Sequence, residues 1–156
     1  MRRRTLLAAS AVALTGCLDS FTGESELREH EFYSARERLA DTGDAMYTSE
    51  QEARGAVVDD ATEFVEDTDF DDSVLVYVEA RAPQACYDIE LADVTSTGRV
   101  LEANFEVVRG ADDEDACADV VTDVSGLLRA SFAGPRPLSA HGVVVDEDGE
   151  EREWNV

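Results

Sequence analysis

Val74-Leu75-Val76-Tyr77-Val78 is the stretch that decides the fold of this 156-residue chain. All five residues are apolar or aromatic and three are β-branched, a composition that favours a strand. A strand with one face in water would alternate apolar and polar residues, but this one has no polar position. We therefore expect an inner strand of a sheet that is covered on both faces.

One cover is predicted just upstream of this strand. Ser49-Glu50-Gln51-Glu52 has the pattern of a capping box, in which the Ser side chain accepts a hydrogen bond from a first-turn amide. It opens a predicted amphipathic helix at residues 50–66, whose apolar side chains fall on one face. Those side chains are Ala53, Val57, Ala61, Phe64 and Val65. This face is suited to pack against one side of the strand.

The rest of the chain predicts shorter strands. Apolar and polar residues alternate at 86–94 and 100–108, with a hairpin turn at 95–98. Further strands are expected at Val120-Val121, at 127–132 and at 142–145, and Trp154 is expected to enter the core from an edge strand. The fold class is therefore mostly β: a single antiparallel β-sandwich-like domain at residues 45–156, with one helix packed on it. Residues 27–39 are compatible with either a helix or a strand.

The N-terminus carries the pattern of an export signal. Arg3 and Arg4 precede the apolar run 6–14, which is far shorter than the roughly 20 residues that span a bilayer. Leu14-Thr15-Gly16-Cys17 resembles the lipobox of bacterial and archaeal lipoproteins, and Arg3-Arg4-Thr5-Leu6-Leu7 resembles a twin-arginine signal. The resemblance implies that residues 1–16 are removed and that Cys17 carries a lipid on the outer face of the cell membrane. Residues 17–44 would then contain the lipidated N-terminus, a tether, and the segment 27–39 that is compatible with either a helix or a strand.

The net charge of the chain limits the classes of partner that it can bind. It has 36 Asp and Glu against 13 basic residues, all of them Arg, and removal of residues 1–16 moves the net charge from −23 to −26. This Lys-free, acid-rich composition resembles that of proteins from halophilic archaea, in which high salt screens the repulsion between carboxylates. Nucleic acid is disfavoured as a partner because its binding depends on clusters of Lys and Arg.

The cysteines predict one disulfide. The lipid would consume Cys17, which leaves Cys86 and Cys117 as a pair in an exported chain, where disulfides persist. Two buried thiols are the alternative. A zinc site is disfavoured because two isolated cysteines without paired His ligands are too few.

A second resemblance concerns about half of the chain. Thr68-Asp69-Phe70-Asp71, the strand at 74–80, Pro83 and the following Cys86-Tyr87 resemble the β-sandwich domain of PrcB-type protease-complex proteins. Ala85-Cys86 stands where that family has glycines. The resemblance implies a sandwich fold and an association with a protease complex.

The sequence predicts no catalytic residue, metal site or cofactor. His30 and His141 have no neighbouring ligand pattern, and no GxSxG, HExxH, Walker or GxGxxG motif occurs. The Asp-x-Asp-x-Asp spacing of Asp67, Asp69 and Asp71 suits a hard cation, but Asp72 and Val78 stand where a calcium loop needs Gly and Glu. Hydrated acidic loops are the favoured interpretation.

Two classes of function remain open. The first is a surface-anchored binding module for an unknown ligand, such as an envelope protein. The second is an envelope enzyme, for example a hydrolase that uses carboxylates. A cleft that brings two carboxylates together, one of them buried, would favour the enzyme.

Overall fold

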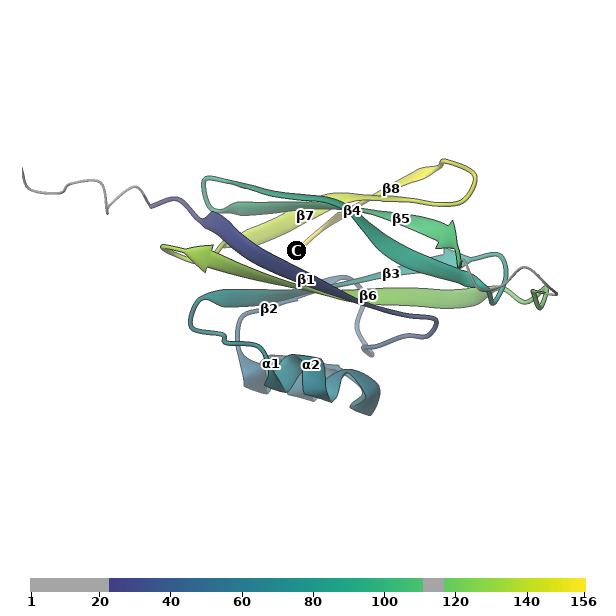
Figure 1. Cartoon of the computed structure of the whole chain (residues 1–156), viewed down its shortest axis with the longest axis horizontal. Coiled ribbons are helices and arrows are strands. Elements are labelled where there is room, and N and C mark those ends of the chain that lie inside the picture. The colour runs from purple at the N-terminus through teal and green to yellow at the C-terminus, as the bar shows by residue number, and fades with distance from the viewer. Residues whose placement is uncertain (1–22, 111–116) are drawn as a thin grey trace, which may run out of the picture.

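The computed structural model describes residues 23–110 and 117–156 as two face-to-face sheets with helices outside one of them (Figure 1). Sheet 1 has the strand order β1-β6-β3-β2 and sheet 2 the order β4-β5-β7-β8. Arg3, Arg4 and Cys17 lie outside the described residues. The elements are β1 Glu26–Ala35, β2 Ala45–Tyr47, α1 Glu50–Ala56, a 3-10 turn Asp59–Ala61, α2 Thr62–Glu66, β3 Ser73–Ala82, β4 Tyr87–Thr97, β5 Val100–Arg109, β6 Thr122–Ala133, β7 Ser139–Val145 and β8 Glu151–Asn155.

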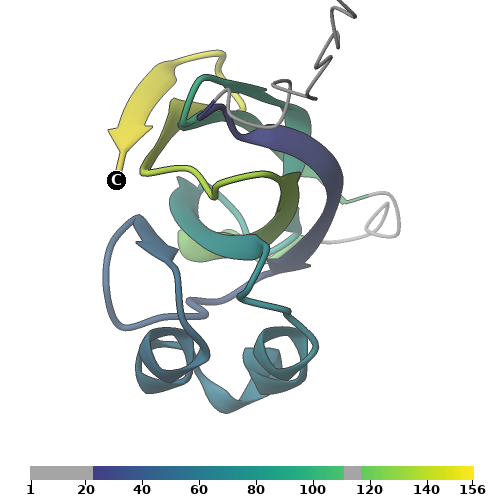
Figure 2. The same ribbon diagram turned by 90° about the vertical axis from the view of Figure 1, so that its left-hand side faces the viewer.

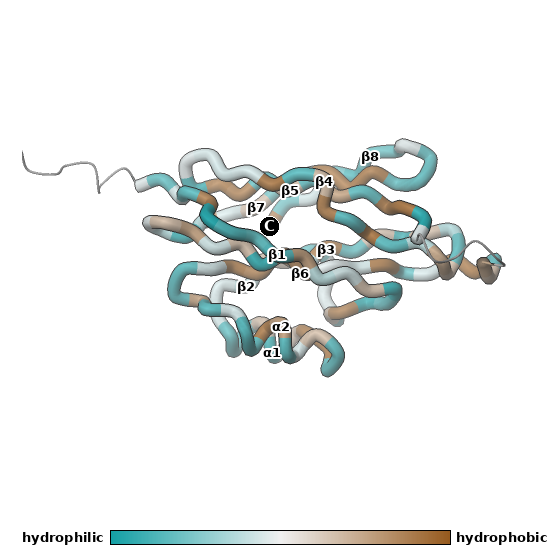
Figure 3. Tube along the Cα trace, viewed as in Figure 1, coloured by the Kyte–Doolittle hydropathy of each residue, from teal (hydrophilic) through white to brown (hydrophobic). Residues whose placement is uncertain are grey.

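The stretch at 74–78 is the core of β3, and the prediction that both of its faces are covered is confirmed. Val74, Val76 and Val78 point between the sheets, into a cluster that includes Phe105. Leu75 and the side chains that share its face pack under the helices. Figure 2 shows the helices beneath sheet 1, and Figure 3 shows apolar residues concentrated between the layers. One strand thus supplies two apolar cores through its period of two.

The predicted helix at 50–66 is broken in two. Val57 and Val58 are extended, with ψ of 140° and 162°. The break occurs because residues 39–41 pair with this segment: Ala40 forms a β-bridge with Val57, and the Val58 N–H donates to the Leu39 carbonyl at 2.8 Å. The capping prediction is confirmed, since the Ser49 side chain accepts from the Glu52 N–H at 3.3 Å. The cover is also formed as expected, with Ala53, Ala61 and Val65 fully buried.

The ambiguous segment at 27–39 is mainly strand. β1 pairs with β6 along its whole length, so the sandwich begins at Glu26 and not at the expected residue 45. Phe32 packs on Phe105 at 5.4 Å between ring centroids, which explains why this stretch is extended and half-buried. The N–H of Ser25 donates to the Gly98 carbonyl at 2.6 Å, so the strand begins beside the β4–β5 turn.

Sheet 2 departs from the expected antiparallel pattern at one pair. β4 and β5 form the predicted hairpin, where Gly98 adopts a positive φ of 61° that suits glycine. β5 and β7 are parallel, because the chain crosses to sheet 1 for β6 before it returns. Trp154 is buried on the edge strand β8, as predicted. Val120 and Val121 do not form a strand; they are exposed and precede β6.

The predicted disulfide is present. Cys86 and Cys117 are bonded, with a distance of 5.5 Å between their Cα atoms, which lies in the usual range. Cys86 immediately precedes β4 in sheet 2, and Cys117 lies on the segment that leads into β6 in sheet 1. The bond therefore links the two sheets covalently at one end of the sandwich.

Candidate functional site

A groove follows the free edge of β3. β2 has only three residues and pairs with Leu75–Tyr77, so no strand of the described residues lies beside β3 on this edge from Val78 to Ala82. A hollow of about 490 Å³ opens there, and a second of about 220 Å³ shares Ala80, Arg81 and Arg152 with it. We call the two together the β3-edge groove.

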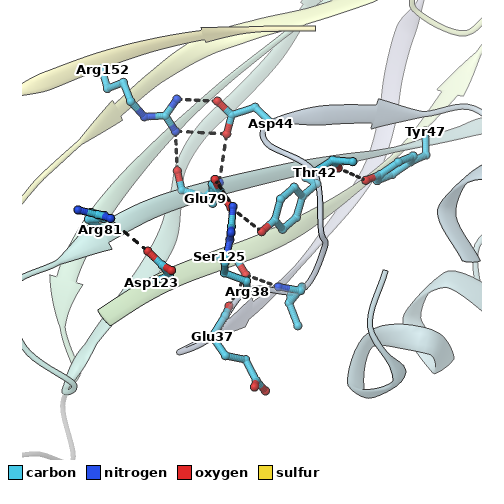
Figure 4. A network of polar contacts seen from close by, with 12 residues as sticks. Glu37, Arg38, Thr42, Asp44, Tyr47, Glu79, Arg81, Asp123, Ser125 and Arg152 are labelled. Carbon is cyan, nitrogen blue, oxygen red and sulfur yellow. Dashed lines mark hydrogen bonds and ion pairs between the residues drawn. The ribbon is translucent and has the colours of Figure 1, made fainter. Parts of the chain in front are cut away.

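Charged side chains from distant parts of the chain meet in the larger hollow (Figure 4). Its three cations come from the β1–β2 connection, β3 and β8, and its three carboxylates lie beside them. They are Arg38, Arg81 and Arg152, with Asp44, Glu79 and Asp123. The formal charges of this lining cancel, whereas the whole chain carries −23. The hollow is therefore a local exception to a strongly acidic surface.

Glu79 is the centre of the network. Its carboxylate accepts from Arg38 Nε and Nη2 at 3.0 and 2.9 Å, and from the Tyr77 hydroxyl at 3.0 Å. Burial, reinforced by the charge of Glu79, raises the pKa of Tyr77 to about 12, so the phenol stays protonated and donates. The hydrogen bond to Glu79 also raises the pKa of Arg38.

The backbone of Glu79 is paired by side chains instead of by a strand. Its N–H donates to Asp44 Oδ1 at 3.2 Å, and its carbonyl accepts from Arg152 Nη2 at 2.5 Å. Arg152 also binds the Asp44 carboxylate through both terminal nitrogens, at 2.5 and 3.2 Å. Asp44 and Arg152 thus occupy the positions that a neighbouring strand would take. We call this pair the edge plug.

Arg81 is the least committed cation of the groove. Its side chain is 84% exposed, and its Nε lies 3.9 Å from Asp123 Oδ1, beyond hydrogen-bond range. Such a pair contributes little stability in water. Arg81 is therefore available to meet an added carboxylate.

The groove offers ion pairing and a strand edge, not a free general base. The side chains of Asp44 and Glu79 are 16% and 27% exposed, so the groove does hold two largely buried carboxylates. Each accepts two hydrogen bonds from one Arg and a third from a neighbouring N–H or O–H, so three of its roughly four acceptor sites are occupied. The arrangement is suited to recognition.

The residues considered from the sequence are scattered in the fold. His30 and His141 are exposed on different sheets. Asp69 accepts from the Asp71 N–H at 3.0 Å, in an exposed turn. Within residues 23–110 and 117–156, no group of three or more His, Cys, Asp or Glu could hold a metal ion.

Sequence reasoning missed the groove because its residues are far apart along the chain. One signal was present: within β3 the fully buried run ends at Val78 and is followed by Glu79 and Arg81, which indicates that the cover stops there.

Comparison of the chain with family models, curated proteins and solved structures found no match. The resemblance to PrcB-type sandwich domains stays a prediction from the sequence. In the described part of the chain, no helix has the length and apolar character needed to cross a membrane.

Proposed function

We propose that this protein is a lipid-anchored module on the outer face of the cell membrane that binds a protein partner through the β3-edge groove. The observation that carries the proposal is the larger hollow of this groove, whose charges balance beside an unpaired strand edge on a protein with a net charge of −23. The lipobox at 14–17 supports the anchor.

The position of the groove supports its exposure to partners. Cys17 is six residues from Gly23, so the covalent reach between them is at most about 22 Å. Ser25 is held beside Gly98 and Pro135, and this end of the sandwich would face the membrane. β3 runs from that end towards the disulfide, as Figure 1 lets the reader follow. Glu79 and Arg81 would then lie on the half that faces away from the lipid.

Cross-linking and pull-down from intact membranes at native salt test the binding function. The wild-type protein should capture a specific partner, and Arg81→Glu should lower the yield at least fivefold. Arg28→Glu makes the same charge change on an exposed position of β1 and should leave the yield unchanged. Absence of any stable partner with the wild-type protein would contradict the module.

Fractionation tests the anchor separately. Cys17→Ser should move the protein from the membrane to the soluble fraction, because the acyl chains provide the hydrophobic attachment. A variant that stays as firmly in the membrane as the wild type would show that the anchor is wrong.

A further inference from the structure

We propose that the partner binds by adding an extended strand to the free edge of β3, where it pairs with Arg81 and displaces the edge plug from Glu79. This inference rests on the proposed function, since it names how the groove would hold a protein partner. Strand addition uses main-chain hydrogen bonds for affinity and alternate side chains for specificity.

The register of β3 shows which groups the edge offers. In an antiparallel ladder, alternate residues direct both their N–H and C=O to the same side. Ser73 donates to the Asp69 carbonyl at this edge, and the backbone of Glu79 pairs with the edge plug. By the same alternation, Arg81 directs its N–H and C=O to this edge, beyond the last residue of β3 that β2 pairs.

The edge plug indicates what the edge is built to accept. Asp44 supplies an acceptor to the Glu79 N–H and Arg152 supplies a donor to the Glu79 carbonyl, as the backbone of a neighbouring strand would. A partner strand can replace both contacts while Asp44 and Arg152 stay paired with each other. Displacement of the plug then exchanges hydrogen bonds of similar kind and costs little net energy.

The two hollows provide room for the side chains of an added strand. Successive side chains of a strand point to opposite faces. On one face they would enter the larger hollow beside Arg81, and on the other the smaller hollow beside Ala80 and Val144. The first position suits an acidic side chain, because Arg81 is exposed and loosely paired. The second suits a small uncharged side chain, because Ala80 and Val144 line it together with the carboxylates of Asp146, Glu150 and Glu151.

The charge of Arg81 argues against a second copy of this chain as the occupant. Two copies that joined antiparallel through their β3 edges would bring Arg81 near its own symmetry mate, and like charges across a strand pair are unfavourable. A different protein with alternating acidic and small apolar residues avoids this repulsion. We therefore expect a heterologous partner.

The probe is a synthetic eight-residue peptide of alternating Glu and Val, labelled for fluorescence anisotropy and titrated against the full-length protein at native salt. A peptide of the same composition with its Glu and Val residues in two blocks is the control. The alternating peptide should bind at least tenfold more tightly. The exchange of the Arg81 amide hydrogen with solvent should slow when it binds, which a contact through side chains alone would not cause.

Three variants make the test specific. Arg81→Pro removes the edge N–H but no bond of the β3–β6 ladder, so it should fold and lose at least tenfold in affinity. Arg81→Glu should bind the Glu and Val peptide more weakly and an alternating Lys and Val peptide more tightly. This variant tests the site if Arg81→Pro does not fold. Arg152→Ala frees the Glu79 carbonyl but leaves the Asp44 carboxylate without its Arg, so it should bind the Lys and Val peptide, and not the Glu peptide, several-fold more tightly.

Each result separates this inference from the proposed function. If folded Arg81→Pro binds the peptide as the wild type does, strand addition at β3 is wrong. If Arg81→Glu lowers the capture of the membrane partner but the Arg81 amide exchanges as fast in the complex as in the free protein, the groove stands as the binding site and strand addition fails. If the wild type forms a dimer that Arg81→Pro abolishes, the occupant is a second copy and the heterologous partner is wrong.

Discussion

β3 and β5 are inner strands of two packed sheets, yet their burial differs. Every residue of β3 from Ser73 to Val78 is buried, whereas β5 alternates between buried and exposed positions. The outward face of β3 lies under α1 and α2, and the outward face of β5, with Glu102 and Glu106, meets solvent. Sheet 1 is therefore a middle layer and sheet 2 an outer one.

The largest difference in the free energy of unfolding should appear between substitutions on the outward faces of β3 and β5. Leu75→Ala should cost about 3 to 5 kcal/mol of unfolding free energy, because the side chain is fully buried under the helices. Glu106→Ala, on the outward face of β5, should change it by less than about 0.5 kcal/mol. Denaturant titration at fixed salt measures both. Equal costs would mean that the helices do not form a true cover.

The disulfide joins the two sheets, and its removal should cause the next largest loss of stability. Replacement of Cys86 and Cys117 by Ala should cost about 2 to 4 kcal/mol, since the bond closes a loop with a sequence separation of 31. Thermal melts with and without reductant measure the change. Reductant should lower the midpoint of the wild type and leave the double variant unaffected.

The covered face of β3 should also respond to alkaline pH. Tyr77 is fully buried with a pKa of about 12, against about 10 in an unfolded chain. The unfolded state therefore loses the proton first as pH rises. The free energy of unfolding should fall by about 2 to 3 kcal/mol between pH 10 and 12, and below pH 10 Tyr77 should cause no change in it.

Tyr77→Phe should remove most of this pH dependence, as measured by denaturant titration at pH 9 and pH 12. A smaller slope should remain, because burial also raises the pKa of Tyr47. An unchanged slope in the Tyr77 variant would contradict the burial of its hydroxyl.

The cover itself can be strengthened. Gly55 lies in α1, and a Cβ added there would meet nothing within 4 Å, so Gly55→Ala should gain about 0.5 to 1 kcal/mol through helix propensity. The same change at Gly126 in β6 should destabilise the protein, because the new Cβ would overlap the Phe32 ring. Thermal melts of the two variants measure both changes. A loss of stability at Gly55 would contradict the helical assignment of α1.

The smallest effect concerns the uncovered face of sheet 2. Glu90 and Glu106 are exposed and directly opposed across β4 and β5, where like charges are unfavourable. Glu90→Gln should gain a few tenths of a kcal/mol in dilute buffer and nothing near 1 M KCl, where the Debye length is about 3 Å. Melting temperatures across a salt series measure this. A gain that is independent of salt would exclude charge repulsion as its cause.

The sequence predicted the parts of the fold that depend on local periodicity. The apolar run at 74–78, the hairpin around Gly98 and the edge position of Trp154 were all foreseen, as was the pairing of Cys86 with Cys117. These features follow from burial patterns and from an even count of cysteines, which a single chain displays directly.

Features that depend on contacts between residues far apart in the sequence could not be predicted from local periodicity. The helix breaks at Val57 because of a bridge to Ala40, and β1 is a strand because β6 pairs with it. The β3-edge groove is a clearer example, since Asp44 and Arg152 are 108 residues apart in the sequence. Only the change from buried to charged residues after Val78 indicated it.

The position of β6 in sheet 1 determines when that sheet can form during translation. Both β1 and β3 pair with β6, and the register joins Glu26 to Ala133. Sheet 1 therefore cannot close until Ala133, about a hundred residues after β1, has been synthesised, which takes roughly 5 to 20 s at usual translation rates. During that interval β3 lacks its neighbour β6, although α1 and α2, which cover its outward face, precede it in the chain. An unpaired strand edge of this kind is prone to aggregate until β6 has been synthesised.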